Sequence, residues 1–195
     1  EDVALMTSLP GFVVMVPCDA FQARALVREA TKHPGPVYIR TGRPKAPFVY
    51  NEKASFKIGK GVRLREGKDV TLVANGLLVF EALQAEEKLR AEGIEASVVD
   101  FHTVKPLDEE LLLEEARRTH AFVVSEEHQI WGGLGSAVAR LLSQEHPIPI
   151  EFVAIQDSYA ESGKPEELFQ KYGLTASHIV GAAKRVLARK GRVSV

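Results

Sequence analysis

Residues 36–44 of the 195-residue chain have the sequence PVYIRTGRP, and this stretch decides how the first part of the chain folds. Val37, Tyr38 and Ile39 are β-branched or aromatic residues, which favour a buried strand. The following residues, Thr41 to Pro44, supply a hydroxyl, a flexible glycine, a guanidinium and a proline that ends the strand. The stretch therefore predicts a strand that leads into a tight basic loop, where a small anion could bind.

Arg43 is the candidate anion-binding residue of this loop. A guanidinium can hold a phosphate through two parallel hydrogen bonds, and a loop fixed by glycine and proline would present it well. A single arginine is, however, more often a solvated or ion-paired surface residue. The loop by itself leaves both interpretations open.

The residues before this strand predict a β-α-β unit. A short helix that Asp2 can cap ends at Pro10 and Gly11, and Phe12–Val16 forms a continuous apolar run typical of a strand buried on both faces. Asp19 then caps a helix over residues 20–31. Such an order with short connections requires a parallel pair of strands. Because two strands do not form a stable sheet alone, we expect a fragment of a larger domain.

The residues after the basic loop predict an irregular linker and then a second unit. Polar residues and scattered aromatics over residues 46–59 indicate a linker draped over a surface, and residues 60–65 predict a short edge strand. Alternating strands and helices follow, with strands expected at residues 70–74, 94–101, 121–125 and 150–155. The fold class is therefore α/β, with an open, mostly parallel sheet covered by helices on both faces. Ligands in such folds bind beyond the carboxyl ends of the strands.

Composition excludes several classes of protein. With 45% hydrophobic and 26% charged residues the chain is typical of globular proteins rather than disordered ones. A net charge of -1 and a pI near 6.7 suggest neither nucleic acid nor an anionic membrane as a partner, and no apolar run approaches the length of a membrane span. The single cysteine, Cys18, excludes an internal disulfide and favours the reducing cytoplasm.

The glycine-rich stretch WGGLGS at residues 131–136 is the one candidate phosphate loop. It begins a dinucleotide fingerprint, and Asp157 lies at about the distance in sequence that a ribose ligand needs. Val138, however, stands where the third glycine belongs. The pattern therefore favours a packing role for these glycines over nucleotide binding.

Glu126, Glu127 and His128 form the best candidate acid-base cluster, at the end of a predicted strand. A structural role or a subunit contact is the alternative that we favour, because strand-end loops are often merely polar. None of the six histidines is spaced with another histidine or cysteine as metal ligands are, so no metal site is predicted.

Several stretches together resemble the carboxyl-terminal part of transketolase, notably the bacterial and archaeal kind made as two polypeptides. They are EDVALMTSLPG, VYIRTGRP, GKDVTLVANG, VVDFHTVKPLDEELL, VSEEHQIWGGLGSAVA and ESGKPEELFQKYGLT. The KPLD and GG-x-G motifs also occur in deoxyxylulose phosphate synthase and in the β chain of 2-oxo acid dehydrogenases. ESGKPEEL and RTGRP are similar to transketolase in particular.

The resemblance implies a division of the chain into the end of a thiamin-diphosphate pyrimidine-binding domain (1–45), a linker (46–59) and a transketolase C-terminal domain (60–195). It implies a transferase of the pentose phosphate pathway that moves a two-carbon ketol unit from a ketose phosphate to an aldose phosphate. Arg43 matches the family arginine that binds sugar phosphate. Glu126, Glu127 and His128 are expected to be interface or structural residues.

The same resemblance implies that the active site is incomplete in this chain, with neither catalytic nor cofactor-binding residues in it. Thiamin diphosphate and a divalent cation such as Mg²⁺ would be bound by the complete enzyme, and the chain alone would be inactive. Its expected partner is the N-terminal transketolase section or subunit, in a homodimer or heterotetramer.

Two other functions stay open from the sequence. The chain could be an assembly or regulatory module of a related thiamin-diphosphate enzyme, such as deoxyxylulose phosphate synthase or a 2-oxo acid dehydrogenase β chain. It could also be an oxidoreductase that binds a nicotinamide nucleotide at Gly132 to Gly135.

Overall fold

The larger of two sheets has the strand order β3-β5-β4-β7-β8 in the computed structural model, which describes residues 1–190. The strands are β3 (Val62–Arg65), β4 (Val70–Ala74), β5 (Ala96–Asp100), β7 (Phe122–Gln129) and β8 (Ile150–Ile155). β3 is an antiparallel edge strand, and the other four strands pair in parallel. The predicted mostly parallel sheet with a short edge strand is confirmed. Residues 191–195 of the predicted second domain lie outside the described residues.

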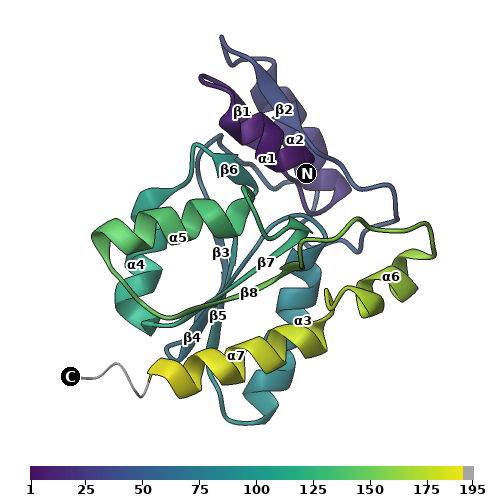
Figure 1. Cartoon of the computed structure of the whole chain (residues 1–195). Coiled ribbons are helices and arrows are strands. Elements are labelled where there is room, and N and C mark those ends of the chain that lie inside the picture. Colours follow the sequence, from purple (N-terminus) through teal and green to yellow (C-terminus); the bar gives the residue numbers. More distant parts are fainter. Residues whose placement is uncertain (191–195) are drawn as a thin grey trace.

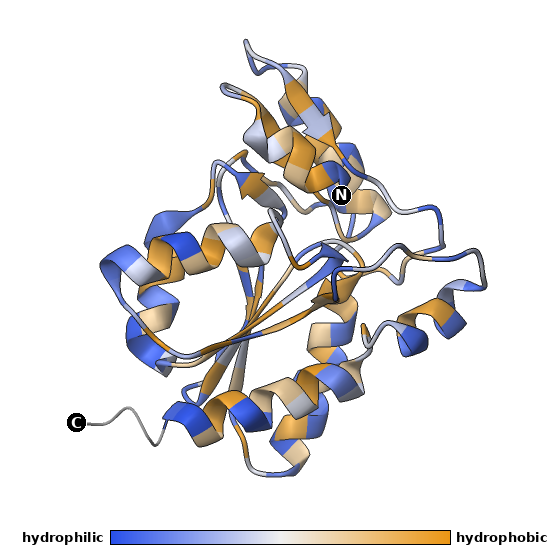
Figure 2. Cartoon of the chain, viewed as in Figure 1, coloured by the Kyte–Doolittle hydropathy of each residue, from blue (hydrophilic) through white to orange (hydrophobic). Residues whose placement is uncertain are grey.

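Helices cover both faces of this sheet, as Figure 1 shows. α3 (Leu78–Ala91) and α7 (Ala176–Lys190) pack on one face, and α4 (Glu109–Thr119) and α5 (Leu134–Glu145) pack on the other. The apolar residues of these elements face inward (Figure 2), and all five residues of β4 are buried. A strand that is apolar throughout must be covered on both faces, which explains the two layers of helices. α6 (Pro165–Lys171) begins at Pro165, as its sequence predicts.

The first part of the chain forms α1 (Asp2–Ser8), β1 (Val13–Met15), α2 (Ala20–Ala30) and β2 (Val37–Ile39), which together we call the N-terminal unit. β1 and β2 pair in parallel, as predicted, and the Asp19 side chain caps α2. Asp2 does not cap α1. Its carboxylate accepts a hydrogen bond from the Tyr38 hydroxyl instead.

A third strand of the small sheet comes from the other unit and was missed by the sequence analysis. β6 (Thr103–Lys105) pairs antiparallel with β1, so the small sheet has the order β2-β1-β6. Three residues are too few to show a periodicity, and Pro106 follows them directly. β6 joins the two units through backbone hydrogen bonds.

The N-terminal unit lies over the carboxyl ends of β4 and β7 (Figure 1). The Gly76 N–H, just after β4, donates to the Val16 carbonyl at 3.1 Å, and the Val16 N–H donates to the His102 carbonyl at 2.8 Å. A Cβ at Gly76 would contact the Val16 side chain at 2.9 Å. The edge at which open α/β sheets bind ligands is thus covered by the chain itself.

The segment between the units, residues 46–59, has no helix or strand. It is not simply draped over the surface, as its composition suggested, because Phe56 is buried and Tyr50 packs against it. No helix within residues 1–190 combines the length and the apolar character needed to cross a membrane.

Candidate functional site

Arg43 lies on the exposed loop that leaves β2, where the sequence predicts an anion-binding residue. Among the described residues it makes no hydrogen bond or ion pair with another side chain. A cleft of about 410 Å³ opens beside the loop, and it is lined by Thr41, Gly42 and Lys45 from the loop and by Cys18 and Asp19 from just before α2, but not by Arg43 itself. The guanidinium is therefore free to meet a ligand.

Arg40, three residues earlier, has a different environment. Its Nε lies 3.3 Å from the Asp2 carboxylate and its Nη1 lies 3.6 Å from the Glu127 carboxylate. Tyr38 donates its hydroxyl to Asp2 at 2.8 Å. Two carboxylates thus neutralise Arg40, which makes Arg43 the arginine of this stretch that is available to an anion.

Glu126 is buried beneath the glycine-rich stretch. Its two carboxylate oxygens accept hydrogen bonds from the backbone N–H groups of Leu134 and Gly135, both at 2.8 Å, at the start of α5. A Cβ at Gly133 would overlap this carboxylate. Burial raises the pKa of Glu126 to about 7, although the two N–H donors oppose the shift.

This arrangement overturns the nicotinamide-nucleotide hypothesis. The N-terminus of α5 would have to present its N–H groups to a phosphate, but Glu126 already occupies them. Gly133 is needed because the Glu126 carboxylate lies close to it, and a Cβ at Gly135 would meet the Phe152 ring at 2.9 Å.

His128 ties the larger sheet to α1. Its Nδ1–H donates to the Gln129 carbonyl at 2.8 Å, and its Nε2 accepts the Ala4 N–H at 3.3 Å. Burial lowers the pKa of this histidine, which agrees with a neutral ring that donates at one nitrogen and accepts at the other. Glu127 reaches the same unit through Arg40, so both residues contact the N-terminal unit of their own chain.

Metal-ligating side chains are not clustered among the described residues. Within residues 1–190 no group of three or more His, Cys, Asp or Glu side chains is placed to hold a metal ion. Both carboxylate oxygens of Glu126 and the Oδ2 of Asp100 accept hydrogen bonds inside the chain, whereas Asp100 Oδ1 is buried without a partner among the described residues.

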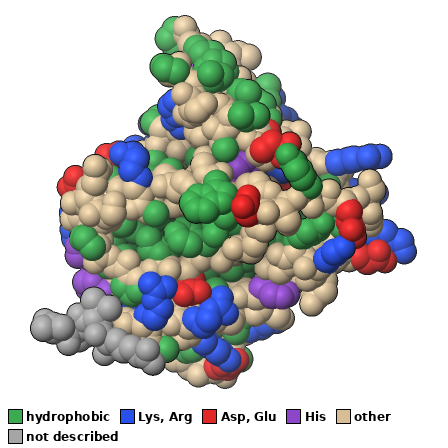
Figure 3. Space-filling model, viewed as in Figure 1, with side chains coloured by type: hydrophobic (Ala, Val, Ile, Leu, Met, Phe, Trp, Pro, Cys, Tyr) green, Lys and Arg blue, Asp and Glu red, His purple; other side chains and the backbone are tan. Residues whose placement is uncertain are grey.

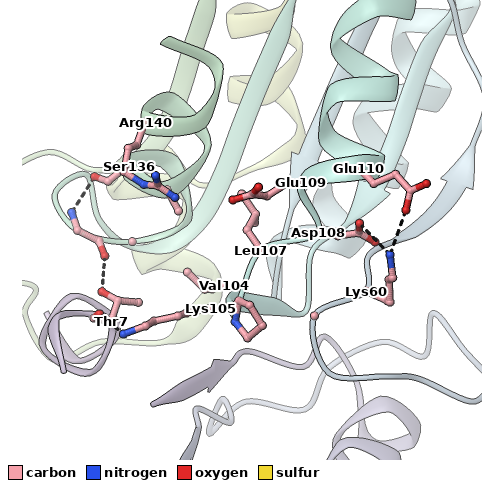
Figure 4. Close-up of a pocket in the computed structure, with 15 residues that line it drawn as sticks. Thr7, Lys60, Val104, Lys105, Leu107, Asp108, Glu109, Glu110, Ser136 and Arg140 are labelled. Atoms are coloured by element: carbon pink, nitrogen blue, oxygen red, sulfur yellow. Dashed lines mark hydrogen bonds and ion pairs between the residues drawn. The ribbon is translucent and has the colours of Figure 1, made fainter. Parts of the chain in front are cut away.

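A larger cleft of about 700 Å³ lies between α1, the turn before α4 and the start of α5 (Figure 4). Lys105 at its edge donates to the carbonyls of Thr7 and Leu9 at 2.9 and 2.6 Å. Lys60 pairs with Asp108 and Glu110 at 3.4 and 3.3 Å. Lys60, Asp108 and Glu110 are thus ion-paired within the chain, and Lys105 is hydrogen-bonded to backbone carbonyls.

The sequence analysis missed a buried polar cluster at the junction of the two units, formed by Asp19, Gln22, Tyr50 and Asp100. Asp100 is completely buried at the end of β5. A charged residue that follows the apolar run Val98-Val99 at the end of a buried strand was the available signal, since buried charges need partners.

Comparison with known proteins identifies the family. The model of the transketolase C-terminal domain matches residues 59–179, and the model of the transketolase pyrimidine binding domain matches residues 1–48. The chain belongs to the transketolase family. The resemblance seen in the sequence is confirmed, and so is the fold class.

This transketolase chain has close relatives among subunits of split enzymes. It is 45% identical over 190 residues to the 6-deoxy-6-sulfo-D-fructose transketolase subunit SqwH of a Clostridium species, covering 97% of this chain and 59% of that protein. It is 39% identical over 184 residues to a subunit of the apulose-4-phosphate transketolase of Phocaeicola vulgatus, covering 94% of this chain and 59% of that subunit.

A solved structure described as a split gene transketolase, inactive beta4 tetramer, superposes with a TM-score of 0.95 at 51% identity. The match covers 97% of this transketolase chain and 62% of that one. The chain thus spans about three fifths of the length of these relatives.

Proposed function

We propose that this chain is part of a transketolase that transfers a two-carbon ketol unit from a ketose phosphate to an aldose phosphate. We further propose that residues 1–45 end its pyrimidine-binding domain, that 46–59 link the domains, and that the C-terminal domain begins at residue 60. The family matches to residues 1–48 and 59–179 support this division. The single buried cysteine supports a reducing, cytoplasmic setting.

The proposed substrate class depends on the exposure of Arg43. It is exposed on the loop after β2, whereas Arg40 is held by Asp2 and Glu127. A free guanidinium on a short loop beside a cleft is suited to bidentate binding of a phosphate. One relative is named for a phosphorylated sugar, apulose 4-phosphate.

The partner that we propose is the N-terminal section or subunit of the enzyme, in a dimer or heterotetramer. Four of the six large hydrophobic residues exposed in the described part of the chain lie in the first 48 residues: Leu5, Leu9, Val27 and Phe48. In the view of Figure 3 the N-terminal unit, at the top, carries mainly hydrophobic and uncharged side chains. β2 is moreover at the edge of its sheet, where another strand could pair. Within that assembly, Glu126, Glu127 and His128 keep the structural role described above.

The cofactor of the family is thiamin diphosphate, and we propose that the partner supplies most of its site. When bound, this cofactor supplies the carbanion chemistry of the transfer. Calorimetry should therefore show tight binding of thiamin diphosphate with Mg²⁺ only when the chain is assembled with the partner. Turnover of xylulose 5-phosphate by the purified 195-residue chain alone would contradict the proposal, and binding without any turnover in the assembly would favour a regulatory module.

The substrate class is tested by Arg43→Ala in the complete enzyme. Loss of a charge-assisted bidentate contact should raise KM for phosphorylated sugars by on the order of tenfold or more and leave KM for unphosphorylated sugars nearly unchanged. Arg117→Ala, which removes an exposed arginine from α4, is the matched control. Equal effects of Arg43→Ala on both kinds of sugar would refute phosphate binding.

A further inference from the structure

Asp100 connects three segments at the junction of the two units. Its Oδ2 accepts a hydrogen bond from the Gln22 amide at 2.6 Å and another from the Tyr50 hydroxyl at 2.7 Å. Gln22 belongs to α2, Asp100 ends β5, and Tyr50 lies in the irregular segment between the units. Burial and the nearby Asp100 raise the pKa of Tyr50, so the phenol stays protonated and is the donor.

Tyr50 is also held by its backbone. The Asp19 carboxylate accepts the Tyr50 N–H at 2.8 Å and the Val49 N–H at 2.9 Å, while its other oxygen accepts the Gln22 N–H at 2.8 Å. The ring of Tyr50 meets the buried ring of Phe56 edge to face, with centroids 4.7 Å apart. Contacts of its backbone, its ring and its hydroxyl therefore hold Tyr50 in place.

The loop that carries Arg43 runs between two fixed points. It begins where the Arg40 N–H donates to the Met15 carbonyl at 2.9 Å, and it ends at Val49 and Tyr50. The residues between have no helix or strand, and most of them are exposed. Phe48 adds a contact with Phe21, at 4.9 Å between ring centroids. The position of Arg43 thus depends on the two anchors at the ends of its loop.

We propose that Tyr50 and Asp100 are positioning residues for Arg43, holding the end of its loop so that the guanidinium meets the substrate phosphate in a fixed place. The inference rests on the proposed phosphate-binding role of Arg43. It assigns the C-terminal domain, through Asp100, an indirect part in substrate recognition. A displacement of about 1 Å in a positioning group can cost a large factor in rate or affinity.

Tyr50→Phe in the complete enzyme is the direct test, because it removes only the hydroxyl and keeps the ring that packs on Phe56. It should raise KM for a phosphorylated aldose by roughly three- to tenfold, with kcat changed less than about twofold and unphosphorylated sugars unaffected. In an Arg43→Ala background the same change should have no further effect on KM, since residues that act through one group are not additive. Tyr172→Phe is the matched control, because it removes a hydroxyl that accepts only the Glu161 N–H at 3.1 Å.

Limited digestion with trypsin gives a readout independent of activity. Lys45 is the exposed tryptic site of the loop, because Arg43 precedes a proline and Arg40 is partly buried and ion-paired. Tyr50→Phe should speed cleavage after Lys45 at least severalfold and leave the melting temperature close to that of the control. If Tyr50→Phe proves unstable, Asp100→Asn is the second variant. It should also speed cleavage after Lys45.

The outcomes separate the two proposals. An equal rise in KM for both kinds of sugar after Tyr50→Phe, or a rise that persists in the Arg43→Ala background, would overturn positioning while leaving phosphate binding by Arg43 in place. Unchanged cleavage after Lys45 in both variants would overturn it as well. An Arg43→Ala enzyme that handles phosphorylated sugars normally would overturn the proposed function, and positioning with it.

Discussion

Replacing Gly133 by alanine should destabilise the chain strongly, because the new Cβ would overlap the Glu126 carboxylate. That side chain is only 3% exposed and accepts the Leu134 and Gly135 N–H groups at 2.8 Å. A hydrogen bond to a charged group contributes about 1.5–3 kcal/mol, so losing both at pH 8 costs about 3–6 kcal/mol. Because proteins are stable by only about 5–15 kcal/mol, the variant should be marginally folded.

Thermal unfolding followed by circular dichroism measures this effect. For a chain of this size 1 kcal/mol shifts Tm by about 2–4 °C, so Gly133→Ala should lower Tm by at least about 6 °C. Gly181→Ala is the matched control: it lies inside α7 with only the flexible Arg185 guanidinium nearby, at 3.5 Å, and should stabilise by up to about 1 kcal/mol. Combining Gly133→Ala with Glu126→Ala should recover part of the loss, because the overlap and the displaced buried charge are both removed. A Gly133→Ala chain that unfolds within 2 °C of the unaltered one, or a double variant no more stable than Gly133→Ala, would refute the reasoning.

Three further predictions concern buried groups. Burial raises the pKa of Asp100 to about 7, so between about pH 4 and 7 the folded chain holds a proton that the unfolded chain has lost, and the free energy of unfolding should fall as pH rises through that window. For Asp100→Asn, urea unfolding should show a smaller fall in the free energy of unfolding over this pH window. An identical dependence of that free energy on pH would contradict the prediction. Glu115 is fully buried, and its carboxylate binds Arg63 and Arg118. Glu115→Gln removes this charge and should lower the free energy of unfolding by about 3 kcal/mol in the same assay. An unchanged urea midpoint would argue against this. His128→Ala removes the acceptor of the α1 backbone and should speed hydrogen exchange in residues 2–8 of the complete enzyme with little loss of turnover; a large loss with the assembly intact would point to catalysis instead.

Patterns that depend on neighbours in sequence were predictable, and patterns that depend on distant partners were not. The apolar runs of β1 and β4 must be buried whatever covers them, so the local sequence was enough to predict these strands. β6 exists only because β1 lies beside it, and no local propensity marks Thr103–Lys105 as a strand. The role of Glu126 likewise depends on Gly133, which lies close to its carboxylate. The glycine pattern suggested close packing at this point but could not show that the neighbour is a carboxylate.

The candidate site likewise has one feature that the local sequence predicted and another that depends on distant residues. Arg43 could be singled out because glycine and proline beside it predict a loop, and the structure leaves it exposed. The sequence does not show, however, that the neighbouring Arg40 is ion-paired, as it is with Asp2 and Glu127 in the fold. Which of the two arginines is available to a ligand was therefore decided by tertiary contacts.

Open parallel sheets bind ligands beyond the carboxyl ends of their strands, at the point where the strand order reverses. In this chain the reversal falls at β4, between β5 and β7, and the N-terminal unit fills that position through the Gly76 to Val16 hydrogen bond and through β6. The place that would hold a ligand in a solitary domain is instead used to join the two units. The loop after β2 lies outside this junction and stays exposed, and a cleft opens beside it. The C-terminal domain influences that loop through segments that cross between the units, and the Tyr50 phenol, bound to a carboxyl at the end of β5, is such a crossing.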